Sequence, residues 1–199
     1  MKLSWVTLLV ALCAWVLPHS AFAQSTPARI ISMTIEGPDG VIQGESVQVG
    51  KEGSHLILGY SHEIISPRDA ASGLPTGKRQ HKPFTIVKYI NRGSPLLLNA
   101  MAKEESLDVE ITLWGTAPGT GQEVKVFTYR LRGASIVAIR PWMPNKNDPA
   151  TSSYAPAEEI SFTYRSIEQT FVNGGITAQD DWENGRDAAK GAKTAPAKP

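Results

Sequence analysis

The stretch Ile160-Ser161-Phe162-Thr163-Tyr164-Arg165 alternates apolar and polar residues without a break. Successive side chains of a β-strand point to opposite faces, so Ile160, Phe162 and Tyr164 would share one face. That face is apolar and aromatic, whereas the other carries short polar or charged groups. The stretch therefore predicts a strand with one face on a hydrophobic core, in a segment that extends to residue 167.

Similar short segments recur on the N-terminal side of this stretch. We expect further strands at residues 29–36, 41–49 (weak, because Gly44 interrupts it), 55–65, 83–90, 109–114, 124–131 and 135–140. Turn-forming Gly, Pro, Asn and Asp residues separate them, as in the hairpin turn expected at Gly119-Thr120-Gly121. Many short strands at this spacing predict a mostly β protein, either a closed barrel or a sandwich.

One helix is expected, at about residues 94–104. Ser94 is a suitable N-cap, and Pro95 fits the first helical position, where its missing N–H costs nothing. Leu97 and Met101 are four residues apart, so they share a face that can pack on the β-sheet.

Composition excludes several classes of protein. The 199 residues include 20 Lys+Arg and 19 Asp+Glu, a net charge of +1, so a general binder of nucleic acid or anionic membrane is not expected. Hydrophobic residues make up 41%, enough for a folded core. The one cysteine, Cys13, excludes a disulfide framework and any thiolate metal cluster.

The two ends of the chain look different from the body. Residues 1–23 resemble a secretory signal peptide, with Lys2, an apolar run, and a small-x-small site that predicts cleavage between Ala23 and Gln24. The run is shorter than the roughly 20 residues of a membrane-spanning helix, so no stable membrane anchor is expected. An uncleaved anchor and a true start at Met33 are the alternatives. Residues 183–199 lack large apolar side chains and predict a disordered tail, which leaves 24–182 as the folded domain.

The sequence carries no recognisable catalytic constellation. His55, His62 and His81 lack the spacing of a helical metal site, and each is expected to be a surface or partly buried imidazole. The pair Glu104-Glu105 is most simply interpreted as the end of a helix, and the pair Glu158-Glu159 as the start of a strand. We therefore predict no catalytic residue, no cofactor-binding residue and no metal ligand, and expect that the protein is not an enzyme.

Two segments remain as candidates for contacts with other molecules. The loop of residues 66–82 is longer than most loops and is rich in charge. Its candidate contact residues are Arg68, Asp69, Lys78, Arg79, His81 and Lys82. Near the C-terminus, Asp181 and Trp182 form a candidate anchor for the last part of the fold.

Several stretches resemble the hemolysin-coregulated proteins (Hcp), the tube-forming subunits of bacterial type VI secretion. They follow the family's order across about residues 30–182. They are Ile35-Glu36-Gly37, Pro67-Arg68-Asp69, the run from Ser72 to Pro83, the run from Ser94 to Ala100, Ala134-Ser135-Ile136-Val137, Asn147-Asp148-Pro149, Phe162-Thr163-Tyr164-Arg165 and Asp180-Asp181-Trp182. Each stretch alone is weak evidence for this family, but the stretches together are specific for it.

The resemblance implies a two-sheet β-barrel of short antiparallel strands with one flanking helix. It also implies a homohexameric ring, head-to-tail stacking of rings into a hollow tube, and a role in carrying effectors. Its partners would be further copies of itself, type VI effectors and spike proteins. The 66–82 loop would reach a neighbouring subunit or ring.

Some features depart from the family. Its members are normally made without a cleaved signal, whereas this chain has one and is expected to be secreted or periplasmic. It also has the extra tail, and Trp114-Gly115-Thr116 replaces the aromatic-Arg step often seen after that tryptophan. The alternative function is thus an exported Hcp-fold binding module that works outside the tube.

Overall fold

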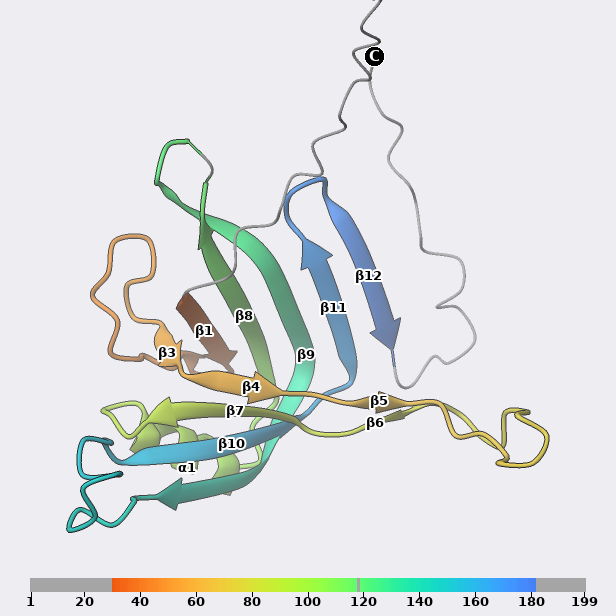
Figure 1. Ribbon diagram of the computed structural model, residues 1–199, viewed down its shortest axis with the longest axis horizontal. Coiled ribbons are helices and arrows are strands. Elements are labelled where there is room, and N and C mark those ends of the chain that lie inside the picture. Colours follow the sequence, from red (N-terminus) through yellow and green to blue (C-terminus); the bar gives the residue numbers. More distant parts are fainter. Residues whose placement is uncertain (1–29, 118, 182–199) are drawn as a thin grey trace, which may run out of the picture.

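The computed structural model describes residues 30–117 and 119–181, and the fold in this part of the chain is mostly β with one helix (Figure 1). The predicted fold class is therefore confirmed. The elements in chain order are β1 (Ile30–Gly37), β2 (Gly40–Val41), β3 (His55–Ile57), β4 (Gly59–Ser61), β5 (Ile64–Ile65), β6 (Gln80–His81), β7 (Phe84–Tyr89), α1 (Ser94–Ala102), β8 (Leu107–Thr116), β9 (Glu123–Trp142), β10 (Ala157–Thr163), β11 (Ser166–Phe171) and β12 (Ile176–Asp181).

The strands form two antiparallel layers that share the long strand β9. Its first part pairs with β8 and β11, and its second part pairs with β10. The change of partner lies around Gly133, whose φ of 57° is a left-handed backbone conformation that favours glycine. One layer continues through β8 to β1, and the other continues through β10 and β7 to β4, in a direction that crosses the first (Figure 1).

The two layers approach each other again at β3 and β4. β3 pairs with β1, whereas β4, which follows after Leu58, pairs with β7. The Leu58 N–H donates to Val87 O at 2.8 Å across this bend. The bent segment from β3 to β4 therefore connects the two layers a second time. The strand pairing does not form an uninterrupted closed barrel.

The core lies between the two layers and the helix. The residues predicted to share the core face of β10 and its continuation are buried: Ile160 and Phe162 are 0% exposed and Tyr164 is 9% exposed. From α1, Leu97 and Ala100 are buried, and Met101 packs against the same cluster, as the helical spacing predicted. None of the described helices is long and apolar enough to cross a membrane.

Some predicted boundaries are wrong. Residues 42–49 are not a strand, because the backbone of Gly44 packs against that of Ser54, where an added Cβ would lie 2.3 Å from the carbonyl oxygen. This segment therefore folds as an irregular loop, and Val47 and Val49 are each 89% exposed. The segments 124–131 and 135–140 are one strand, whereas 55–65 and 160–167 are divided. Strand β12 had no predicted counterpart, because five of its six residues are Thr, Ala, Gln or Asp.

The helix begins at Ser94, as predicted, but its cap and its end differ from the prediction. Gly93, not Ser94, is the N-cap, and it makes no side-chain capping bond. The Ser94 hydroxyl instead accepts from the Asn91 N–H at 3.0 Å and donates to Glu158 at 2.7 Å. The α-helix ends at Ala102, two residues before the predicted end, because Glu104 adopts a left-handed φ of 54°.

Candidate assembly surface

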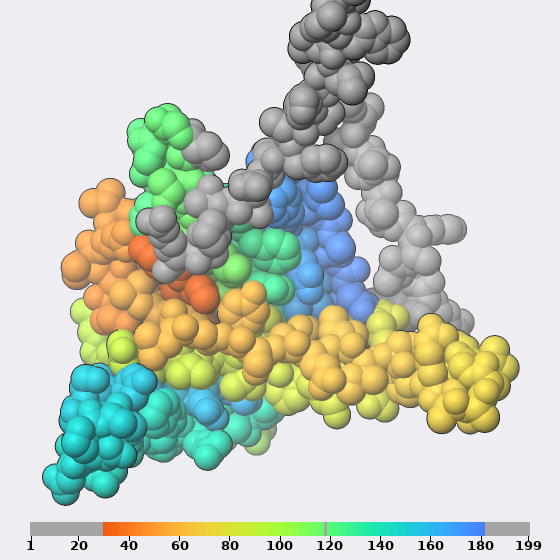
Figure 2. Space-filling model, in the orientation of Figure 1, coloured from red at the N-terminus to blue at the C-terminus, as the bar shows by residue number. Residues whose placement is uncertain are grey.

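The long loop projects from the body as an arm, defined here as residues 64–81, with β5 and β6 at its base (Figures 1 and 2). The base is a short antiparallel pair in which Ile64 lies opposite His81. In the space-filling view the arm, in yellow, extends beyond the rest of the molecule (Figure 2). At its outer end, Leu74 is 66% exposed. The predicted loop is therefore a surface feature, as expected, although its last part forms β6.

The outer part of the arm is held by its own hydrogen bonds. The Asp69 carboxylate accepts from the Ser72 N–H at 2.7 Å and from the Ser72 hydroxyl at 2.7 Å. These bonds lower the pKa of Asp69, because they favour its charged form. The Arg68 guanidinium donates to Gly73 O at 3.0 Å. An arm closed on itself in this way can present Leu74 in a defined position.

The predicted contact residues divide into two groups. Arg68, Asp69, Lys78 and Lys82 are exposed. Arg79 and His81 instead turn toward the body, where both contact the Asp180 carboxylate of β12. Local sequence pattern could not reveal this second group, because Asp180 lies about a hundred residues further along the chain.

The contacts at the arm's base form what we call the base cluster: His62, Arg79, His81, Tyr164 and Asp180. The Tyr164 hydroxyl oxygen lies 2.6 Å from His62 Nε2 and 2.7 Å from His81 Nδ1. The His81 Nε2 atom lies 3.0 Å from Asp180 Oδ2, and the His81 side chain is only 3% exposed. The Arg79 guanidinium binds both carboxylate oxygens of Asp180. The cluster thus ties both sides of the arm's base to Tyr164: the outgoing leg through His62, two residues before the arm, and the returning leg through His81, which also contacts β12.

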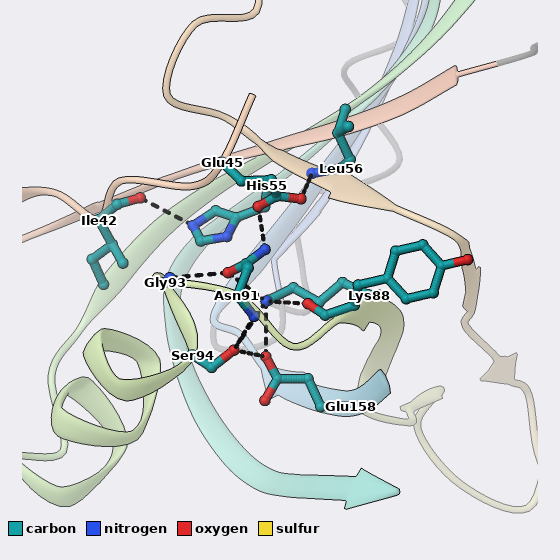
Figure 3. A network of polar contacts seen from close by, with 10 residues as sticks. Ile42, Glu45, His55, Leu56, Lys88, Asn91, Gly93, Ser94 and Glu158 are labelled. Carbon is teal, nitrogen blue, oxygen red and sulfur yellow. Dashed lines mark hydrogen bonds and ion pairs between the residues drawn. The ribbon is translucent and has the colours of Figure 1, made fainter. Parts of the chain in front are cut away.

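A second polar network lies under α1 (Figure 3). Lys88 of β7 and Glu158 of β10 are cross-strand partners, and their charged atoms are 2.8 Å apart. Their side chains are 0% and 4% exposed. The Lys88 ammonium also donates to Asn91 Oδ1 at 3.0 Å. Asn91 donates in turn to Glu45, which lies in the loop between β2 and β3. This network fixes the start of α1 against β7, β10 and the loop that carries Glu45.

His55 lies beside this network and is fully buried, so the expectation of a surface or partly buried imidazole is wrong for it. Its Nε2 lies 3.0 Å from Ile42 O, whereas its Nδ1 has no hydrogen-bond partner among the described residues. Burial lowers the pKa of His55, because it penalises the charged imidazolium. The backbone of Gly93 packs so closely on this ring that an added Cβ would lie 2.4 Å from His55 Cε1.

Two long strand edges have no partner among the described strands, in addition to the edges of the short strands β2 to β6, each of which pairs on one side only. β12 pairs with β11 alone. The Ser135–Trp142 part of β9 pairs with β10 alone, because its pairing with β8 ends at Ala134. Each such edge presents backbone N–H and C=O groups that can pair with another chain. Val137 and Trp142, on this part of β9, are both exposed.

Other predicted sites are not described by the structure. The cleavage site at Ala23 and Gln24 lies outside the described residues, as do Trp182 and the tail at 183–199. Asp181, the other half of the candidate anchor, is the last residue of β12, and its carbonyl accepts from Arg79 at 3.4 Å. In residues 30–117 and 119–181, no three His, Cys, Asp or Glu side chains form a group that could hold a metal ion.

Comparison with known proteins gives one consistent result. A protein-family profile described as "Type VI secretion system effector, Hcp" matches residues 33–171. The "Major exported protein" of Pseudomonas aeruginosa is 38% identical over 141 residues, which cover 71% of this chain and 82% of that protein.

Solved structures agree with this match. A protein described as "Hcp protein" has a TM-score of 0.71 at 31% identity and covers 78% of this chain and 98% of its own. The secreted protein Hcp3 of Pseudomonas aeruginosa has a TM-score of 0.62 at 32% identity, with coverage of 77% and 97%. The family profile spans both layers, the arm and the helix, so this chain belongs to the Hcp family of the type VI secretion system.

Proposed function

We propose that this chain is a ring-forming structural subunit of the type VI secretion system, whose hexamers stack into a hollow tube that carries effectors. The observation that carries the proposal is the family match over residues 33–171. We further propose that the chain has no catalytic activity of its own and that its partners are other copies of itself, type VI effectors and spike proteins.

The two long unpaired edges, of β12 and of the Ser135–Trp142 part of β9, are compatible with a ring. The edge of β12 and the Ser135–Trp142 edge of β9 are different surfaces, so a contact between them on neighbouring copies would be heterologous. A heterologous contact repeated around an axis closes into a ring when the rotation between copies divides a full turn. Such a contact would also cover edges that otherwise invite uncontrolled aggregation.

The arm is the proposed contact between stacked rings. It carries an exposed apolar residue, Leu74, with the exposed charges of Arg68 and Lys78 nearby in sequence, a combination that suits a specific protein contact. Asp181 and Trp182 are proposed to hold the end of the fold beside the arm's base.

We also propose that the chain is exported, with residues 1–23 removed as a signal peptide between Ala23 and Gln24. The matched relative is described as a major exported protein. N-terminal sequencing of protein from the periplasm and the culture fluid tests this: a start at Gln24 is expected. An intact Met1 or a start at Met33 would contradict it.

Sedimentation equilibrium of the purified protein tests the ring. A hexamer is expected at micromolar concentration, and a monomer at every concentration tried would contradict the proposal. Leu74→Asp is then expected to leave the hexamer intact and to abolish longer assemblies, because a charge would have to be desolvated in the ring-to-ring contact. The matched control is Val172→Asp, at the β11–β12 turn, since Val172 is also an exposed aliphatic residue, at 40%. If Leu74→Asp assembles as well as Val172→Asp, the arm has no such role.

A further inference from the structure

The base cluster places three hydrogen-bonding contacts in a row, from His62 through Tyr164 and His81 to Asp180. The first two contacts share the Tyr164 hydroxyl, and a hydroxyl has one hydrogen to donate. The Tyr164 hydroxyl can therefore donate to only one of the two imidazoles, and the other imidazole must donate to it.

With both imidazoles neutral, one arrangement satisfies all three contacts. His81 Nε2 carries a hydrogen, because its partner is the carboxylate of Asp180. His81 Nδ1 is then an acceptor and receives the Tyr164 hydrogen, and the Tyr164 oxygen accepts from His62 Nε2.

One added proton can be accommodated. If it binds His81 Nδ1, that atom donates to the Tyr164 oxygen, and the hydroxyl turns to donate to His62 Nε2. His62 then needs only to move its hydrogen to Nδ1 and stays neutral. In this arrangement His81 Nε2 keeps its contact with Asp180 Oδ2, 3.0 Å away.

A second proton cannot be accommodated. Both imidazoles would then donate to the Tyr164 oxygen, and its own hydrogen would lose its acceptor. Two positive rings would also lie with their centroids 6.4 Å apart, while His62 packs against the ring of Phe84. Like charges in a partly buried site repel, and the uncompensated donor adds a desolvation cost.

We propose that the base cluster is an acid-sensitive latch, which holds the arm to the body while it carries no added proton or one, and releases the arm when it binds a second. The arm is tied at both legs through Tyr164, so loss of these contacts frees His62 on the outgoing leg and loosens His81 on the returning leg. The Arg79–Asp180 contact would remain as a partial tether.

The other ionisable groups around the latch support this order of events. Burial lowers the pKa of His62, and the charge of His81 lowers it further. Burial alone would raise the pKa of Asp180, but the bonds and charges of Arg79 and His81 outweigh it and lower the pKa, so Asp180 stays charged in mild acid. Burial and the charge of Asp180 raise the pKa of Tyr164, which keeps its hydrogen. Asp181, the next residue of β12, adds a second acidic side chain at the end of that strand.

The pKa of His62 determines whether acid favours the closed or the released arm. This pKa is lower in the closed latch than in the released arm, so the released form binds more protons as the pH falls below the ordinary histidine value of 6.5. Acid therefore favours release of the arm. The equilibrium between closed and released arm shifts by up to about tenfold for each unit by which the His62 pKa is lower in the closed latch.

Hydrogen–deuterium exchange of the arm amides in the full-length protein tests the latch. The protein is diluted until it is unassembled, so the result does not depend on ring formation. After correction for intrinsic rates, exchange of residues 66–79 is expected to be severalfold faster at about pH 5 than at about pH 7.5. Exchange in α1 should not change in parallel.

Three variants make the test specific. His62→Gln places an amide N–H donor near the position of His62 Nε2, and an amide does not bind a proton in this pH range. The variant should therefore abolish the pH dependence while the arm stays protected from exchange. Tyr164→Phe should release the arm at both pH values. Tyr60→Phe is the control, because it removes a neighbouring hydroxyl, bonded to that of Tyr129 at 3.2 Å, which lies outside the latch. Equal corrected exchange at the two pH values in the unmodified protein, or wild-type pH dependence in His62→Gln, would overturn the proposal.

Discussion

Glu158→Gln is expected to destabilise the protein strongly, although it replaces a carboxylate by an amide of nearly the same shape. The Lys88 ammonium would remain buried, with its side chain 0% exposed, and would lose the anion 2.8 Å away. Breaking one side of a buried ion pair costs about 3–5 kcal/mol. Lys88 keeps the acceptors Tyr89 O and Asn91 Oδ1, so we expect the lower end, about 3 kcal/mol. This corresponds to a fall in Tm of about 6–12 °C.

The neighbouring residue supplies a matched control. Glu159 also pairs with a basic residue, Arg140, at 3.5 Å, but the two side chains are 37% and 77% exposed. Glu159→Gln should therefore cost less than about 1 kcal/mol. Urea unfolding, followed by fluorescence at a concentration where the protein is unassembled, measures both variants. Equal losses for the two, or a loss below about 1 kcal/mol for Glu158→Gln, would refute the buried-pair reasoning.

Two further predictions concern packing and pH. Gly44→Ala should cost about 1–3 kcal/mol, because its Cβ would collide with backbone at 2.3 Å, whereas Gly59→Ala, with no atom within 4 Å of the added carbon, should be nearly neutral; a comparable loss in the two would contradict this. Stability should also fall as the pH drops below about 6.5, because the unfolded chain then protonates His55 more readily than the folded one. His55→Gln should reduce that slope in urea unfolding measured from about pH 7 to about pH 5, and an unchanged slope would exclude His55 as its source.

The features that the sequence predicted are those that depend on local pattern. The alternation at Ile160, Phe162 and Tyr164 determines which side chains are buried, because a strand presents alternate residues to one face. Leu97 and Met101 likewise follow from helical spacing. Family resemblance supplied the two-layer arrangement, which local patterns left open between a barrel and a sandwich.

The features that escaped prediction depend on contacts between distant segments. Glu158 was assigned correctly to the start of a strand, but its partner Lys88 lies on another strand, and register alone brings them together. Tyr164 joins His62 and His81 from about a hundred and about eighty residues away. Strand β12 escaped because its side chains are mostly polar and exposed, so it lacks an apolar face.

Electron microscopy of the purified protein tests the central claim most directly, since a ring and a solitary subunit differ in shape. Class averages with six-fold symmetry and a central channel, stacked end to end at higher concentration, are the predicted result. Solitary particles under every condition tried would contradict the account.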